Sequence, residues 1–241
     1  MTLPRRKGAA RIATASLGGL GLFFALAWLT RSGASHFGAG KLATHAVLKL
    51  ALIALSLGLW AASRKGLPAM GFARSSPMGR RTVRWYVLSA VGMGSATLVM
   101  IFSGARHPMT AGLTVPQLIV SVWILSSVAE EVFVRGLLQS WMGGLGGDDL
   151  GCRPVVAASA STFAAMHLPL IWSGAGWVGG GAIVFATFVV GWSAAELRAR
   201  SGSLLHPILV HVFGNVSAVP FGVIGVLLYR AIHGTMPAIA R

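Results

Sequence analysis

Acidic residues are scarce in this chain. Only five of its 241 residues are Asp or Glu, and two of them, Glu130 and Glu131, are adjacent within the apolar run 116–142. An ionisable side chain at membrane depth is unfavourable by several kcal/mol unless it is paired or faces water, so such a residue marks a functional site by default. The sequence therefore directs attention to Glu130 and Glu131.

Charged residues of either sign are also few. They make up 10% of the chain, hydrophobic residues make up 55%, and the mean hydropathy is +0.74. Soluble domains contain about 25% charged residues, so an ordinary soluble domain is excluded. Apolar segments that cross a bilayer form helices because a helix satisfies its own backbone hydrogen bonds. We therefore expect an all-α fold, a polytopic integral membrane helical bundle.

Cysteine is nearly absent, and the basic residues are dispersed. Cys152 is the only cysteine, which excludes an intrachain disulfide and a Cys-rich metal site. The net charge of +15 does not indicate a nucleic-acid partner, because the bases lie between apolar segments rather than in a folded basic patch. We expect them to contact anionic headgroups of the lipid bilayer. The sequence does not indicate an oligomeric state.

Apolar runs define the membrane spans. About 20 apolar residues are needed to cross a hydrocarbon core of ~30 Å. Pro220 is compatible with a tight hairpin, a kink or an incomplete final span, so the sequence allows 7–8 transmembrane helices. The expected spans are 12–30, 42–62, 85–104, 116–142, 155–172, 178–197, 204–219 and 220–235.

The basic residues orient these spans. With the N-terminus in the cytoplasm, fifteen of the twenty Lys and Arg residues fall on the cytoplasmic side and three on the opposite side. Lys49 and Arg135 lie within spans. This asymmetry is the positive-inside pattern and predicts a cytoplasmic N-terminus. The richness in Ala, Gly and Arg is typical of a GC-rich bacterial genome, so we expect a multi-pass protein of the bacterial inner (cytoplasmic) membrane.

Glu131 and Arg135 have i,i+4 spacing and share one helix face. Glu130 is rotated from Glu131 by about 100°. We therefore expect Arg135 to pair with Glu131, while Glu130 faces a cavity in which a carboxylate can deprotonate water. The alternative is a structural Glu–Arg clamp between helices beside a second, protonated Glu.

Two further pairs have helical spacing: Phe163 with His167, and His211 with Asn215. A single membrane His is more often an interhelical hydrogen-bonding group than a catalyst. At ~1.5 Å per residue from the cytoplasmic ends, however, Glu130 and His167 lie about 18 Å deep, and His211 and Asn215 about 11 to 17 Å deep. The expected topology thus brings these polar groups to one level.

Three motifs follow one another along the chain. They are Glu-Glu-x-x-x-Arg at 130–135, Phe-x-x-x-His at 163–167 and His-x-x-x-Asn at 211–215. In this order on separate membrane helices, they resemble the motifs of the CPBP intramembrane proteases. This family, also called ABI, comprises CAAX-processing and bacteriocin-processing endopeptidases and includes the Ras-converting enzyme. The resemblance covers roughly residues 116–219.

The resemblance implies roles for seven residues. Glu130 would act as general base on a water molecule that His167 helps to hold and activate. His211 and Asn215 would stabilise the oxyanion of the tetrahedral intermediate. The supporting residues would be Glu131, Arg135 and Phe163.

The resemblance also implies an activity and a domain plan. The chain would be an intramembrane endopeptidase that hydrolyses a peptide bond near a membrane-associated segment of a membrane-anchored protein or peptide. Family substrates include CAAX-like prenylated C-termini, bacteriocin-like precursors and C-terminal sorting tags. We expect a single membrane domain over 1–241: two family-variable helices in 1–62, the catalytic core in 85–219, and a C-terminal helix or tail in 220–241.

Several alternatives remain open at this stage. One Glu and two His could bind zinc, but His-Glu-x-x-His is absent and Asn215 is a poor zinc ligand, which favours a mechanism without a cofactor. A proton-coupled transporter or a non-catalytic immunity protein could contain the same polar residues. Glu196 and Arg200 are expected to form a surface pair. Asp148 and Asp149 are expected to be solvated turn residues.

Overall fold

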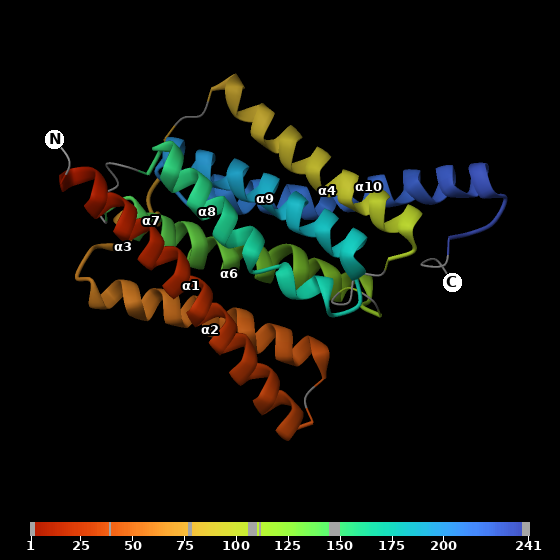
Figure 1. The fold of residues 1–241 in the computed structure, drawn as a ribbon, viewed down its shortest axis with the longest axis horizontal. Helices are drawn as coiled ribbons and strands as arrows, with labels where there is room; N and C mark the ends of the chain where they lie inside the picture. Colours follow the sequence, from red (N-terminus) through yellow and green to blue (C-terminus); the bar gives the residue numbers. More distant parts are fainter. Residues whose placement is uncertain are drawn as a thin grey trace.

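A computed structural model of the protein describes residues 3–38, 40–76, 79–105, 110, 112–144 and 150–237. Within these residues every regular element is helical, and seven helices are long and apolar enough to cross a membrane. Most of them run along the long axis of the molecule, and the last helix extends beyond its neighbours at one end (Figure 1). The all-α membrane bundle expected from the sequence is confirmed.

The first three spans and their connections come before the motifs. They comprise α1 (Leu3–His36), α2 (Lys41–Ala62), α3 (Leu67–Met70), η1 (Arg80–Thr82) and α4 (Val83–Ser103). The fourth span consists of α5 (Val115–Gln117), η2 (Leu118–Ser126), α6 (Ser127–Glu131), η3 (Val132–Leu138) and α7 (Gln139–Met142). The rest comprises α8 (Arg153–Ala165), η4 (Leu168–Ile171), α9 (Gly176–Ser201) and α10 (Leu205–His233).

The fourth span forms the centre of the bundle. Every residue from Ala129 to Ser140 is buried, and segments of this span contact α1, α2, α8, α9 and α10. Its elements η2 and η3 are π-helical and flank the short α-helix α6, which carries Glu130 and Glu131. π-helical segments within helices are rare and frequently occur at functional sites. The adjacent glutamates therefore lie between two irregular segments in the interior of the protein.

The last two expected spans are a single helix. α10 continues through Pro220 from Leu205 to His233, so the separate helices expected over 204–219 and 220–235 are wrong, as is the hairpin. Seven spans result. The φ angle of proline fits a helix, and its missing N–H removes only one hydrogen bond. A break at membrane depth would leave several backbone groups unsatisfied in lipid, which is the larger penalty.

The fifth expected span is interrupted. α8 ends at Ala165, His167 lies in a turn, and η4 follows as a 3₁₀-helix in place of one helix over 155–172. Pro169 explains the break, because a proline ring clashes with the carbonyl four residues earlier and disfavours the α conformation of the residue before it. His167 is consequently held at a helix end.

Candidate active site

Glu131 and Arg135 form a buried ion pair. Nη1 of Arg135 lies 3.2 Å from Oε1 of Glu131, and both side chains are 0% exposed. Nη2 of Arg135 donates to the carbonyl oxygen of Gly191 at 2.7 Å, and the guanidinium lies 4.6 Å from the ring centre of Phe163. The expected i,i+4 pair is therefore present, and it joins the fourth span to α8 and α9.

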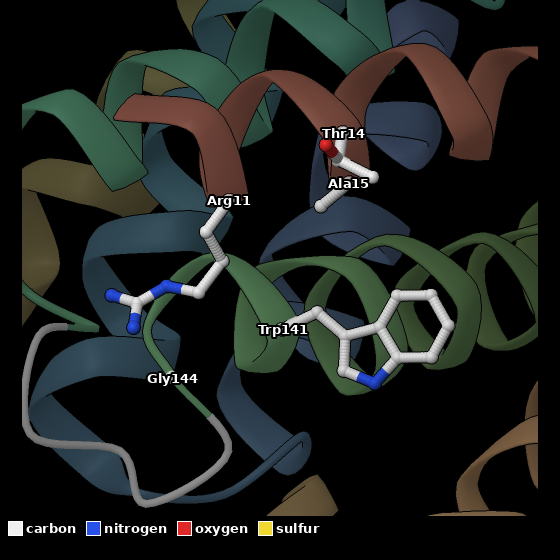
Figure 2. Close-up of a pocket in the computed structure, with 5 residues that line it drawn as sticks. All are labelled: Arg11, Thr14, Ala15, Trp141 and Gly144. Atoms are coloured by element: carbon white, nitrogen blue, oxygen red, sulfur yellow. The ribbon is translucent and has the colours of Figure 1, made fainter. Parts of the chain in front are cut away.

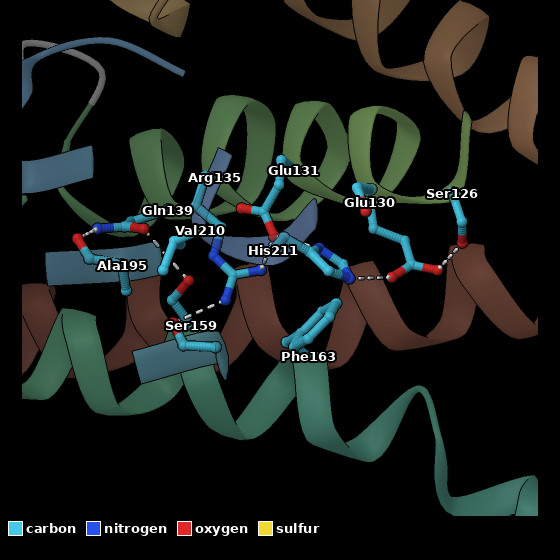
Figure 3. A network of polar contacts seen from close by, with 12 residues as sticks. Ser126, Glu130, Glu131, Arg135, Gln139, Ser159, Phe163, Ala195, Val210 and His211 are labelled. Carbon is cyan, nitrogen blue, oxygen red and sulfur yellow. Dashed lines mark hydrogen bonds and ion pairs between the residues drawn. The ribbon is translucent and has the colours of Figure 1, made fainter. Parts of the chain in front are cut away.

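Gln139, which the motifs do not include, lies one helical turn beyond Arg135 and extends this network. Its Nε2 donates to the carbonyl oxygen of Ala195 at 3.1 Å and to that of Leu150 at 3.3 Å. Its Oε1 accepts a hydrogen bond from Ser159 at 3.3 Å (Figure 3). The sequence contained one indication of this role: Gln139 is an amide four residues after Arg135 within an apolar run, so it lies on the same helix face.

Glu130 is buried and has a different environment at each oxygen. Oε1 accepts a hydrogen bond from Oγ of Ser126 at 2.8 Å and a second from the ammonium group of Lys49. Oε2 lies 3.7 Å from Nε2 of His211 (Figure 3). One oxygen is thus held by two donors, while the other faces an imidazole at a distance longer than a hydrogen bond.

His211 lies between the two glutamates. Its Nδ1 is 2.9 Å from Oε1 of Glu131 (Figure 3). An ionised carboxylate can only accept, so Nδ1 carries the proton in this contact. Nε2 is the nitrogen that faces Glu130. The sequence predicted that Glu131 would turn to Arg135, and the structure adds that the same carboxylate oxygen also orients His211.

Phe163 separates the two motif histidines. Its ring centre lies 5.0 Å from that of His167 and 5.2 Å from that of His211, both in edge-on geometry. Nδ1 of His167 lies 2.9 Å from the carbonyl oxygen of Phe163 and donates to it, since a carbonyl only accepts. Nε2 of His211 lies 3.7 Å from Oε2 of Glu130, and the ring of Phe163 contacts both imidazoles. His167 and His211 therefore lie on the same side of the bundle as Glu130.

Asn215 lies one turn beyond His211 on α10 and reaches α6. Its Nδ2 donates to Oγ of Ser127 at 3.1 Å, and the side chain is partly exposed. Ser127 begins the short helix that carries Glu130. Both residues thus contact α6: His211 contacts the carboxylates of Glu130 and Glu131, and Asn215 contacts the hydroxyl of Ser127.

Lys49 on α2 is a site residue that sequence reasoning noted as lying within a span but did not assign. Its side chain is 5% exposed, and its ammonium contacts Glu130. At ~1.5 Å per residue, Lys49 lies about 20 Å from the end of α2 at Ala62, close to the depth of about 18 Å for Glu130. The depth argument used for the motif residues places Lys49 at the level of Glu130 and is the signal that could have made it a candidate.

A pocket lies at one end of the fourth span. It is lined by Arg11, Thr14, Ala15, Trp141 and Gly144 (Figure 2). Trp141 is eleven residues beyond Glu130, about 16 Å along the helix, so this pocket is separate from the glutamate site. The cavity expected around Glu130 stays a prediction.

The remaining polar candidates are Glu196 with Arg200, and Asp148 with Asp149. Glu196 and Arg200 form the expected surface pair at 2.8 Å. Asp148 and Asp149 lie outside the described residues. In the part of the chain that the structure describes, no three His, Cys, Asp or Glu side chains are grouped so that they could hold a metal ion.

Comparison with known families gave one match, which covers part of the chain. Residues 112–217 match the family described as type II CAAX prenyl endopeptidase Rce1-like. The matched segment contains all three motifs and agrees closely with the expected range 116–219. No curated protein and no solved structure matched the chain. The segment that contains the glutamate site is therefore similar to the Rce1-like family of type II CAAX prenyl endopeptidases, in agreement with the resemblance that the three motifs indicated.

Proposed function

We propose that this protein is an intramembrane endopeptidase in which Glu130 activates water without a metal ion. The family indicates a membrane protease of the CAAX type in general. The observation that carries the specific mechanism is the asymmetry of the Glu130 carboxylate. Its Oε1 is held by Ser126 and Lys49, whereas its Oε2 faces His211 and is free to take a proton.

The hydrolysis begins at Oε2 of Glu130. This oxygen accepts a proton from water, and the resulting hydroxide attacks the carbonyl carbon of the scissile peptide bond. When the C–N bond breaks, the proton passes from Glu130 to the departing amine. His167 donates its Nδ1–H to Phe163, so its Nε2 is the nitrogen that can accept a hydrogen bond from the same water and hold it.

The negative charge of the tetrahedral intermediate requires donors. Nε2 of His211 and Nδ2 of Asn215 are one helical turn apart on α10 and can serve as a pair. The hydrogen bond from Nδ1 of His211 to Glu131 fixes the ring and turns Nε2 towards the reacting carbonyl. Nε2 donates to the oxyanion when the ring carries both protons, because only the imidazolium form donates from both nitrogens. Asn215 exchanges a neutral hydrogen bond to Ser127 for a stronger one to an oxyanion as charge develops.

A zinc ion fits this donor set poorly. Glu130 and two histidines are the available ligands, and the ammonium group of Lys49 already contacts the carboxylate. A second, divalent cation at the same carboxylate would be repelled by that ammonium. The polar environment of Glu130 thus favours the metal-free mechanism.

The setting and substrates follow from the sequence and the family. We place the N-terminus in the cytoplasm, because most Lys and Arg residues remain on that side even though the single helix α10 puts Arg230 on the opposite side. The richness in Ala, Gly and Arg supports the bacterial inner membrane. The substrate is a membrane-anchored protein or peptide. A bacterial membrane favours a bacteriocin-like precursor or a C-terminal sorting tag over a prenylated C-terminus.

The experiment that tests this function searches for the substrate itself. The membrane proteome and the secretome of a strain that lacks the gene are compared with those of its parent. A protease predicts a membrane-held precursor that accumulates in the deletion strain and is processed again when the wild-type gene is returned. If no protein changes in length, and the strains differ instead in uptake of a solute, a transporter is the better assignment.

A further inference from the structure

Lys49 is buried near the middle of a membrane span. It is eight residues from the start of α2 at Lys41, about 12 Å along the helix, and it is 4% exposed. Lysines near helix ends extend their ammonium groups to the interface, but Lys49 directs its ammonium group inward to Glu130. A buried ammonium is tolerated only with a partner, so the position of Lys49 depends on Glu130.

Glu130 is also the acid that is available to Lys49. Of the three described glutamates, Glu131 is paired with Arg135 and Glu196 with Arg200. The site therefore contains two carboxylates and two basic side chains, one basic side chain on each carboxylate. His211 lies between the two pairs.

The packing of α2 holds Lys49 in this position. Its buried residues Lys49, Leu52, Ser56 and Trp60 follow helical spacing and form one stripe. This stripe faces η2, α6 and η3 of the fourth span. One turn before Lys49, Nε2 of His45 donates to the carbonyl oxygen of Ser121 at 3.3 Å. α2 is thus fixed against the fourth span on both sides of Lys49.

We infer that Lys49 is a positioning residue for the general base, and this inference rests on the function proposed above. Lys49 and Ser126 together occupy Oε1 of Glu130. This arrangement fixes the carboxylate rotamer and leaves Oε2 as the oxygen that takes the proton from water. The helix that supplies Lys49 lies outside the matched segment 112–217, so α2 completes the active site.

The test compares four variants with the wild-type protein on the precursor that accumulates in the deletion strain. Lys49→Met keeps the length of the side chain and removes its charge. Lys49→Arg keeps the charge. Lys41→Met makes the same chemical change at an exposed position of the same helix and is the matched control. Glu130→Gln reports on the proposed base itself.

Lys49→Met is expected to lower kcat on the order of a hundredfold while KM changes little, because the base is misplaced and substrate contacts remain. Lys49→Arg is expected to keep more of the activity, and Lys41→Met all of it. Full activity of Lys49→Met, or equal loss in the Met and Arg variants, overturns the inference. If Glu130→Gln is itself active, the proposed function fails; if only Glu130→Gln is inactive, the inference about Lys49 fails alone.

A stability measurement covers the case in which Lys49→Met accumulates poorly. The double variant with Lys49→Met and Glu130→Gln removes both charges, so it is expected to unfold at a higher temperature than Lys49→Met alone. A double variant no more stable than the single one would show that the two residues are not coupled and would overturn the inference.

Discussion

Nδ1 of His211 lies 2.9 Å from Oε1 of Glu131, the carboxylate that also pairs with Arg135. This contact distinguishes Glu131 from Glu130, the first glutamate of the motif. Glu131 fixes which nitrogen of His211 faces the neighbouring Glu130. The two adjacent acids therefore differ in their contacts, and in the mechanism that we propose Glu131 orients the imidazole while Glu130 acts on water.

Breaking the buried ion pair should destabilise the protein. Glu131→Gln and Arg135→Leu each leave an uncompensated buried charge, and the expected loss is about 3–5 kcal/mol of folding free energy. Thermal unfolding of the purified variants in detergent measures it. Glu196→Gln and Arg200→Leu are the controls, since that pair is partly exposed and contributes about 0–1 kcal/mol. Equal effects at both pairs would contradict the supporting role of Glu131 and Arg135.

Asn215→Ala removes a proposed oxyanion donor. We expect kcat to fall by about 10²–10³-fold with little change in KM, because the donor acts on charge that develops in the transition state. Steady-state cleavage of the precursor measures both constants. Ser127→Ala is the control, because it removes the resting partner of Asn215 but leaves its amide in place. A large rise in KM with an unchanged kcat would instead assign Asn215 to substrate binding.

Gly191 on α9 lies against Arg135 and Phe163. A Cβ added there would lie 3.0 Å from Nη2 of Arg135 and 3.1 Å from Cδ1 of Phe163. Gly191→Ala should therefore shift both residues, lower stability by about 1–3 kcal/mol and reduce cleavage. Gly181→Ala is the control on the same helix, since nothing lies within 4 Å of its added Cβ. Equal stability and activity of the two variants would show that the contact at Gly191 is loose.

Removal of metal ions should leave the activity intact. We expect the purified enzyme to retain cleavage after exhaustive chelation and to contain much less than one zinc per chain. Elemental analysis and the cleavage assay, run on the same sample, measure both quantities. Loss of activity on chelation, restored by added zinc, would replace the proposed mechanism with a zinc-dependent one.

The sequence predicted the bundle well because hydropathy directly reports the length of a span. It did not predict the helix ends that depend on proline. Pro169 and Pro220 both lie in apolar segments. α8 ends shortly before Pro169, whereas α10 continues through Pro220. The difference depends on the tertiary surroundings of each segment, which the local sequence does not encode.

Spacing predicted the pairs within a helix, and tertiary structure supplied the rest. Glu131 and Arg135 could be paired because i,i+4 geometry is local. Lys49 and Glu130 are 81 positions apart, so only the packing of α2 on α6 brings them together. The π-helical segments around α6 likewise have no signature in the hydropathy pattern.

Cleavage of the accumulated precursor by purified Glu130→Gln tests the central claim most directly. The amide keeps the shape of the side chain but cannot accept a proton at neutral pH, so we expect kcat to fall by about 10²–10⁴-fold. The variant should remain folded and inserted, and Glu196→Gln should cleave like the wild type. A folded Glu130→Gln variant that cleaves the precursor at the wild-type rate would contradict the assignment of Glu130 as the base.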